Sequence, residues 1–131
     1  MGAPEHHEEL IKGIFEQLKD IFDSSEQAVY LYLDDAHNAC NKNFAHLLGY
    51  KSPDELSRQK GEGAFIDLFV EEKSQGTLIS AYQNAMEKKI GSTINVTWKR
   101  KDSKPVKTTV ILVPISYSGH MFALHFIAKT A

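Results

Sequence analysis

The stretch that decides the fold spans residues 38–56 and reads NACNKNFAHLLGYKSPDEL. Its first half predicts a short helix. Asn41 stands before that helix, where its side-chain oxygen can accept hydrogen bonds from the unpaired N–H groups of the first turn. Gly49 ends the helix, because glycine readily adopts the left-handed conformation that commonly follows a helix C-terminus. Apolar side chains recur between these two residues at helical spacing and predict one buried face: Phe44, Leu47 and Leu48.

The second half of the stretch predicts another short helix, which begins at Pro53. Ser52 stands before it and can cap its first turn, and Glu55, three residues after Ser52, completes the pattern of a capping box. Proline is common at the first helical position because the N–H that it lacks would be unpaired there. The stretch therefore predicts the end of a strand, a helix of one or two turns, a reversal and a second short helix.

This pattern resembles the early segment of the PAS family of sensory domains. In that segment a strand, an Asn, a short helix, Leu-Leu-Gly-Tyr and a Ser-Pro motif follow one another. The matching residues here are Asn41, Phe44, Leu47, Leu48, Gly49, Tyr50, Ser52, Pro53, Glu55 and Leu56. The resemblance extends more weakly from residue 28 to the C-terminus. It implies the PAS fold, whereas its motifs specify no chemistry.

The remaining sequence predicts the other elements of such a fold. Helical periodicity predicts a short helix or turn over residues 64–70 and a longer helix over residues 71–89. β-Branched and aromatic residues predict strands over residues 28–33, 37–40, 93–101, 105–117 and 120–129. This order predicts an α+β fold with one five-stranded antiparallel sheet, which carries the short helices and one longer helix on one face.

The N-terminal segment, residues 1–25, is expected to precede a PAS-like sensor domain over residues 26–131. We expect residues 1–7 to be frayed and residues 8–22 to form an amphipathic helix. Two alternatives remain open for this helix: it covers a face of the domain's own sheet, or it joins two copies in a homodimer through a short coiled-coil seam. Mixed charge and two glycines predict a mobile loop over residues 58–63.

Composition excludes several classes of function. A net charge of −2 over 131 residues offers no broad field for nucleic acid or an anionic membrane. No apolar run is long enough to span a bilayer, and the N-terminus lacks the apolar centre of a signal peptide. A single cysteine cannot form an internal disulfide, which fits the reducing cytoplasm where we expect the protein. The basic tip at Lys99, Arg100 and Lys101 is ordinarily a solvated turn.

This sequence lacks, at the matching positions, the residues that bind cofactors in the family. Light-sensing members carry a flavin-binding cysteine on the helix after the mobile loop, but Cys40 lies earlier, so we expect it to pack in a strand. Haem-binding members place a histidine on the long helix, and residues 71–89 contain none. His37 and His46 near Cys40 match no compact zinc spacing. We therefore expect neither haem nor covalently bound flavin and no metal site, and the cofactor is left unassigned.

The resemblance implies a ligand site in an apolar pocket between helices and sheet. The candidates on the helical side are Phe44, Leu48, Phe65, Leu68, Leu78 and Tyr82. The candidates on the sheet side are Tyr30, Tyr32, Thr97, Thr109 and His125. Each of them can equally fill the core.

The leading hypothesis for function is a sensory or regulatory module of signal transduction with no catalysis of its own. It would bind a small molecule, or a protein partner such as a histidine kinase. One alternative is a small cone-shaped α+β enzyme, an isomerase or dehydratase, in which Tyr82 or Tyr32 works with Asp67. A surface position of Asp67 would remove that alternative. The other alternative is a purely structural dimerisation domain with a filled core.

Overall fold

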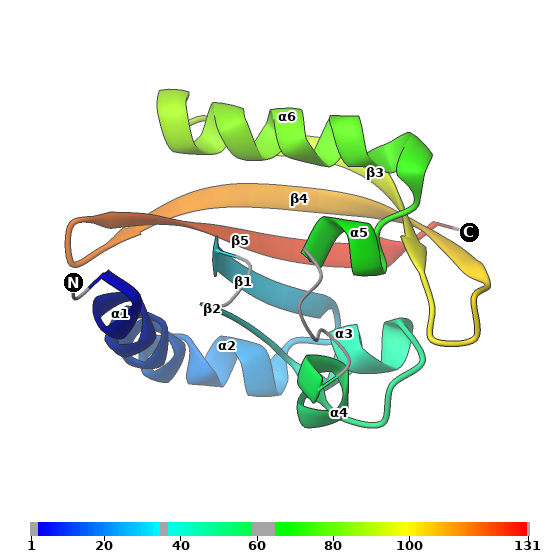
Figure 1. Ribbon diagram of the computed structural model, residues 1–131, viewed down its shortest axis with the longest axis horizontal. Coiled ribbons are helices and arrows are strands. Elements are labelled where there is room, and N and C mark those ends of the chain that lie inside the picture. Colours follow the sequence, from blue (N-terminus) through cyan, green and yellow to red (C-terminus); the bar gives the residue numbers. More distant parts are fainter. Residues whose placement is uncertain (1–2, 35–36, 59–64, 131) are drawn as a thin grey trace.

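One five-stranded antiparallel sheet runs through the centre of the molecule (Figure 1). The computed structural model describes residues 3–34, 37–58 and 65–130, with side chains from residue 7 onward. The strands are β1 (Ala28–Asp34), β2 (His37–Cys40), β3 (Ser92–Lys99), β4 (Pro105–Tyr117) and β5 (His120–Lys129). Their order across the sheet is β2-β1-β5-β4-β3, so the first and last strands of the chain pair with each other. The predicted sheet is confirmed.

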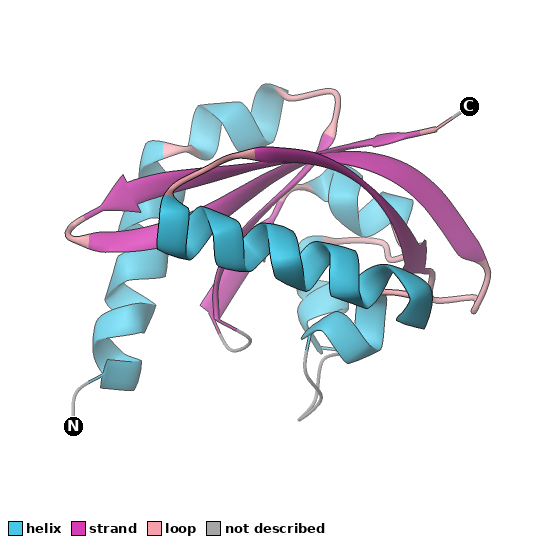
Figure 2. Cartoon of the chain, turned by 90° about the horizontal axis from the view of Figure 1, so that it is seen from above, coloured by secondary structure: helices cyan, strands magenta, loops and turns pink. Residues whose placement is uncertain are grey.

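Helices cover both faces of this sheet. They are α1 (Ala3–Gln17), α2 (Lys19–Ser24), α3 (Lys42–Leu47), α4 (Pro53–Arg58), α5 (Phe65–Phe69) and α6 (Glu72–Lys88). The two views place α1 and α6 on opposite sides of the sheet (Figures 1 and 2). Helices α3 to α6 share a buried core with one face, which we call the inner face. Helices α1 and α2 share a second core with the opposite, outer face.

Successive side chains of β1 point alternately into the inner and the outer core. Tyr30 and Tyr32 contribute to the inner core, whereas Val29 and Leu31 are buried in the outer core. Successive side chains of a strand point to opposite faces of the sheet. A strand covered on both faces therefore needs apolar residues at successive positions, which explains the uninterrupted apolar run of β1.

The stretch that decides the fold adopts the predicted local structure. The side-chain oxygen of Asn41 accepts a hydrogen bond from the first turn of α3 at 3.0 Å. Gly49 follows α3 with φ at +88°, the conformation that favours glycine. Ser52 Oγ accepts a hydrogen bond from the Glu55 N–H at 3.1 Å. The Glu55 carboxylate in turn accepts one from the Lys51 N–H at 2.6 Å, one residue earlier than in the usual capping box.

The N-terminal region differs from the prediction in two ways. Residues 3–7, which we expected to be frayed, belong to α1. The single helix expected over residues 8–22 is divided at Leu18, which separates α1 from α2. The Leu18 N–H bonds to the carbonyls four and three residues earlier, at 3.0 and 3.2 Å. Because this turn is tightened, the chain changes direction there, and Phe22 of α2 still reaches the outer core.

The outer core shows which surface the N-terminal helices cover. Leu10, Ile14 and Phe22 are buried against β1 and β5. The apolar stripe therefore packs on the domain's own sheet, the first of the two alternatives expected for it. Pairing of this region in a homodimer stays a prediction.

The other element boundaries lie within one or two residues of those predicted. Strand β3 begins at Ser92 and ends at Lys99, two residues before the expected end, because the turn into β4 starts there. Helix α5 ends one residue before the expected end, and the expected first residue, 64, lies outside the described residues. Apart from Arg58, which ends α4, the predicted loop over residues 58–63 lies outside the described residues.

Candidate functional site

A cavity of about 140 Å³ lies between the inner face of the sheet and helices α5 and α6. Its walls come from β1, β5, α5 and α6. The lining residues are Tyr30, Tyr32, Phe65, Ile66, Leu78, Ile79, Tyr82 and His125. All of these except Ile66 and Ile79 are candidates that the sequence analysis names for the ligand site.

Aromatic rings form much of this wall. Tyr30 and His125 are direct partners in the pairing of β1 with β5, and their rings stack with centroids 3.9 Å apart. Phe65 of α5 stacks on Tyr30 at 5.1 Å. Tyr82 of α6 meets Tyr32 edge to face at 5.3 Å. Such pairs contribute about 0.5–1.5 kcal/mol beyond their buried area, so the rings hold one another in a defined arrangement.

His125 brings a polar group into the wall, although its exposed fraction is only 2%. Burial lowers the pKa of His125 to about 3, because the charged ring would lose its hydration. The ring is therefore neutral at physiological pH, with one nitrogen as donor and the other as acceptor. Within the described residues, its buried Nδ1 atom makes no hydrogen bond of standard geometry, although the Tyr30 and Ala123 backbones lie close enough to the ring to oppose the fall in the pKa. Since such an atom costs about 1–3 kcal/mol, a hydrogen-bonding ligand would stabilise this arrangement.

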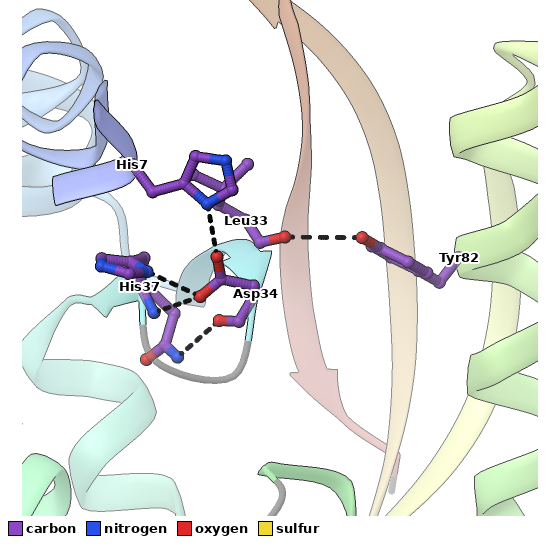
Figure 3. A network of polar contacts seen from close by, with 6 residues as sticks. His7, Leu33, Asp34, His37 and Tyr82 are labelled. Atoms are coloured by element: carbon purple, nitrogen blue, oxygen red, sulfur yellow. Dashed lines mark hydrogen bonds and ion pairs between the residues drawn. The ribbon is translucent and has the colours of Figure 1, made fainter. Parts of the chain in front are cut away.

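Tyrosine hydroxyls add further polar groups. Burial raises the pKa of Tyr30 well above its ordinary value, so its hydroxyl keeps its proton and can donate a hydrogen bond. The Tyr82 hydroxyl donates to the Leu33 carbonyl oxygen at 3.5 Å, which is long for such a bond (Figure 3). The cavity thus combines aromatic walls with a few polar groups, the usual composition of a small-molecule site.

The volume of the cavity limits what it can hold. An engineered apolar cavity of about 150 Å³ binds benzene, whereas pockets for drug-sized ligands span about 300–1,000 Å³. At about 140 Å³, this cavity is of the size that accepts a single ring.

The remaining predicted site residues do not line the cavity. Phe44 and Leu48 are fully buried in the inner core, and Leu68 packs half-buried against the same core. Thr97 and Thr109 alternate along β3 and β4 with residues of the inner core, so their side chains point to the opposite face. Periodicity could have indicated this alternation once the inner face of either strand was known.

The enzyme alternative loses the carboxylate that it requires. Asp67 is exposed on α5, whereas Tyr32 and Tyr82 line the cavity. A general acid or base must lie within hydrogen-bond reach of the reacting group. The expected partnership of a tyrosine with Asp67 is therefore wrong, because the single turn of α5 directs Phe65 inward and Asp67 to solvent.

The candidates for the ligand site omit two lining residues, Ile66 and Ile79. Helical spacing predicts Ile79 on the inner stripe of residues 71–89, three positions before Tyr82, although Ile79 is not among the candidates. Its exposed fraction is 42%, and a large apolar side chain that is both exposed and part of the wall marks the mouth of the cavity. Ile66 follows Phe65 in a helix too short for periodicity to be informative.

The basic turn between β3 and β4 is exposed over residues 101–104, as expected, and two of its basic side chains also contact the protein. Arg100 donates through Nη1 to the Leu47 carbonyl at 2.7 Å, at the C-terminus of α3. Lys101 donates through Nζ to the Glu55 carboxylate at 2.8 Å. These side chains hold the turn against α3 and α4.

The arrangement of sheet and helices can be compared with known proteins. The sequence matches no known protein family and no curated protein. Solved structures do match: a PAS domain of a two-component sensor histidine kinase has a TM-score of 0.64 at 10% identity, over 91% of this chain and 98% of that one. A PAS domain of a Colwellia psychrerythraea protein has a TM-score of 0.64 at 19% identity. The match covers 89% of this chain and 97% of that one. This chain has the PAS fold.

The Rhodobacter sphaeroides LOV protein is a further match to the PAS fold of this chain. It has a TM-score of 0.67 at 16% identity, over 92% of this chain and 68% of that one. At these identities the likeness shows the fold alone. None of the helices in the described residues combines the length and the apolar character that crossing a membrane requires.

Proposed function

We propose that this chain is a sensory or regulatory module of signal transduction, which binds a small molecule in the cavity and has no catalysis of its own. His125 supports this most strongly, because it is a buried, neutral residue of the cavity wall whose Nδ1 has no partner within the described residues. Structures with the same fold include the PAS domains of a sensor histidine kinase and of the fruit-fly ELK potassium channel.

The ligand class follows from the volume and the polarity of the wall. A cavity of about 140 Å³ accepts a single aromatic ring, which would pack against the apolar and aromatic side chains of the wall. A hydroxyl on that ring can both donate and accept, so it can bond with Nδ1 of His125 in either tautomer. Because Nδ1 is covered in the structure, binding includes a small rotation of the imidazole. The proposed class is therefore a small phenol or a similar ring alcohol.

A signal can leave the cavity through β1. Tyr82 of α6 contacts the Leu33 carbonyl by a long hydrogen bond, and the next residue, Asp34, contacts His7 of α1 at 2.7 Å (Figure 3). A ligand that favours one position of α6 changes the strength of the Tyr82 contact and shifts the population of arrangements at α1. The N-terminal helix is then the element that reports occupancy of the cavity.

The output requires a further protein or a homodimer. We propose a histidine kinase or another signalling protein as partner, in the cytoplasm, with self-association through the N-terminal helices. Exposed Ile21 of α2 leaves an apolar side chain on that surface. The net charge of −2 gives no support for nucleic acid as partner. The alternative of a purely structural domain requires a filled core, with which the cavity does not agree.

Titration of ¹⁵N-labelled protein with phenol, and separately with toluene, tests the ligand site. The two probes have similar size, and toluene lacks the hydroxyl. Amide shifts should concentrate in β1, β5, α5 and α6 for both probes. Phenol should bind about 3–10-fold more tightly, which is the range that one hydrogen bond contributes.

Two variants make this test specific. His125→Phe keeps a ring of similar size without a ring nitrogen and should remove the difference between phenol and toluene. Leu78→Phe reduces the cavity volume and should weaken the binding of both probes. Equal affinity of the unchanged protein for the two probes would contradict the role of His125. Shifts confined to residues far from the cavity would contradict the site.

A further inference from the structure

Two histidines and one aspartate from three elements meet beside the N-terminal helix (Figure 3). His7 of α1 lies with Nδ1 2.7 Å from Asp34 Oδ2. His37, at the start of β2, lies with Nδ1 2.8 Å from Asp34 Oδ1. One ligand atom from each of the three residues lies within 4.8 Å of the others. We call these residues the His–Asp cluster.

The backbone positions this cluster accurately. Asp34 Oδ1 also accepts a hydrogen bond from the His37 backbone N–H at 2.8 Å, which fixes the carboxylate at the end of β1. His7 is carried by α1, whose buried stripe packs on the outer face of the sheet. The three residues are therefore held by the fold and do not meet through long flexible side chains alone.

A fourth histidine lies close to the cluster. The ring of His120, at the start of β5, lies 5.9 Å from the ring of His7, centroid to centroid. Nδ1 of His120 lies 3.2 Å from the Ser118 carbonyl, which fixes Nδ1 as the donor and Nε2 as the acceptor nitrogen. A hydrogen bond of this kind on one ring nitrogen is typical of histidines that bind metal through the other.

We propose that the His–Asp cluster binds a divalent transition-metal ion of the Zn²⁺ class through His7 Nδ1, His37 Nδ1 and the Asp34 carboxylate. Water or His120 completes the coordination. On binding, the proton of each Nδ1 moves to Nε2 of the same ring, and the ion takes the place of the two hydrogen bonds.

The three ligand atoms, which lie within 4.8 Å of one another, must move to tetrahedral spacing for this exchange. Ligand atoms bound to Zn²⁺ at about 2.0–2.1 Å in a tetrahedron lie about 3.3 Å from one another. The observed Nδ1–oxygen distances are 2.7 and 2.8 Å, so each imidazole must withdraw by about half an ångström. The side chains of His7, His37 and Asp34 are 30%, 17% and 37% exposed, which leaves an ion a path from solvent.

The donor set selects the kind of metal. Two imidazole nitrogens and one carboxylate suit Zn²⁺, Cu²⁺ or Ni²⁺, whereas Mg²⁺ and Ca²⁺ prefer oxygen ligands. Bound there, the ion would join α1 directly to the last residue of β1 and the first residue of β2. Binding of the ion does not require the ligand proposed for the inner cavity.

Isothermal titration of metal-free protein with ZnCl₂ tests the site. One equivalent should bind, MgCl₂ should give no heat of binding, and EDTA should reverse the reaction. Asp34→Asn and His37→Gln should each weaken Zn²⁺ binding by at least about tenfold, in proteins shown by circular dichroism to be folded. Hydrogen exchange in α1 should slow when Zn²⁺ is added.

Two control variants distinguish binding at this site from general binding of Zn²⁺ to histidine side chains. His46→Gln removes an exposed histidine outside the cluster, and His6→Gln removes the neighbour of His7 in sequence. Both should bind Zn²⁺ as the unchanged protein does. Unchanged affinity in Asp34→Asn and His37→Gln, or the absence of saturable binding, would overturn the proposal.

Discussion

Two regions of the molecule place histidine in opposite environments. In the inner cavity, His125 is buried and neutral, and its Nδ1 has no partner within the described residues. At the His–Asp cluster, His7 and His37 are half-exposed, and both contact the carboxylate of Asp34. The comparison shows that the burial of a histidine and the charge of the side chains beside it decide which kind of ligand it can bind. The buried ring suits a neutral ligand that forms hydrogen bonds, whereas the paired rings suit a cation.

Both regions depend on a single folded unit, and Asn41 holds its two cores together. Its Oδ1 accepts hydrogen bonds from the Val29 and Phe44 N–H groups, both at 3.0 Å. Its Nδ2 donates to the Phe22 carbonyl at 3.3 Å and to the Gln27 carbonyl at 3.0 Å. Asn41→Ala should lower the free energy of unfolding by about 3–4 kcal/mol, because it leaves buried backbone groups unpaired. Urea unfolding measures this change.

Asn43→Ala is the matched control for Asn41→Ala. Asn43 is half-buried and donates to the Ser25 carbonyl at 2.9 Å, so its loss should cost about 1 kcal/mol or less. Similar effects of the two substitutions would show that Asn41 does not have the joining role described here.

The pH dependence of stability tests the environment of His125. Its pKa falls from the ordinary value of 6.5 to about 3 in the folded state. Below pH 6.5 the unfolded chain therefore binds a proton that the folded protein does not, and stability decreases by up to about 1.4 kcal/mol per pH unit. Above pH 6.5 both states are neutral at this residue, and the effect vanishes.

Urea unfolding at pH 7 and pH 4 measures this effect. The unchanged protein should lose about 3 kcal/mol more than His125→Phe over that interval. His46→Gln, which removes an exposed histidine, should follow the unchanged protein. The same loss in His125→Phe would show that His125 titrates as it does in the unfolded chain.

The His–Asp cluster should also hold α1 when no metal is present. Asp34→Asn, measured in EDTA, removes the charge that both imidazoles contact. The free energy of unfolding should fall by about 1 kcal/mol, because the carboxylate is partly exposed and its contacts are partly screened. Hydrogen exchange in α1 should become faster while that in α6 stays unchanged. Equal rates of hydrogen exchange in α1 before and after the substitution would contradict the proposal that the cluster holds α1.

The smallest expected effect on stability comes from loss of the hydrogen bond between Tyr82 and Leu33, which links the cavity to the His–Asp cluster. Tyr82→Phe removes a hydrogen bond of 3.5 Å and should change the free energy of unfolding by about 0.5 kcal/mol or less. It should nevertheless abolish the response of α1 hydrogen exchange to phenol, which still binds in the cavity. An unchanged response would mean that the signal leaves the cavity by another route.

Local patterns predict the fold well because its decisive signals are local. The cap at Asn41 and the glycine at residue 49 act within a few residues, and the sequence shows both directly. The N-terminal helix is harder to predict because its division at Leu18 follows from packing on the outer face. Periodicity shows an apolar stripe but does not show which surface covers it.

The site is less predictable because it depends on which strand face points inward. Of the sheet-side candidates, Tyr30, Tyr32 and His125 line the cavity, whereas Thr97 and Thr109 are placed on the opposite face by alternation within β3 and β4. The His–Asp cluster has no signal in the sequence. His7 lies 27 residues from Asp34, and only the packing of α1 against β2 brings them together.

The most direct test of the central claim is an NMR measurement of the ring nitrogens of His125 during addition of phenol at pH 5. The account predicts a neutral ring before addition, since the pKa is about 3, and a shift of the Nδ1 resonance as phenol binds. A ring that is already protonated at pH 5, or an Nδ1 resonance that does not change when phenol saturates the protein, would contradict it.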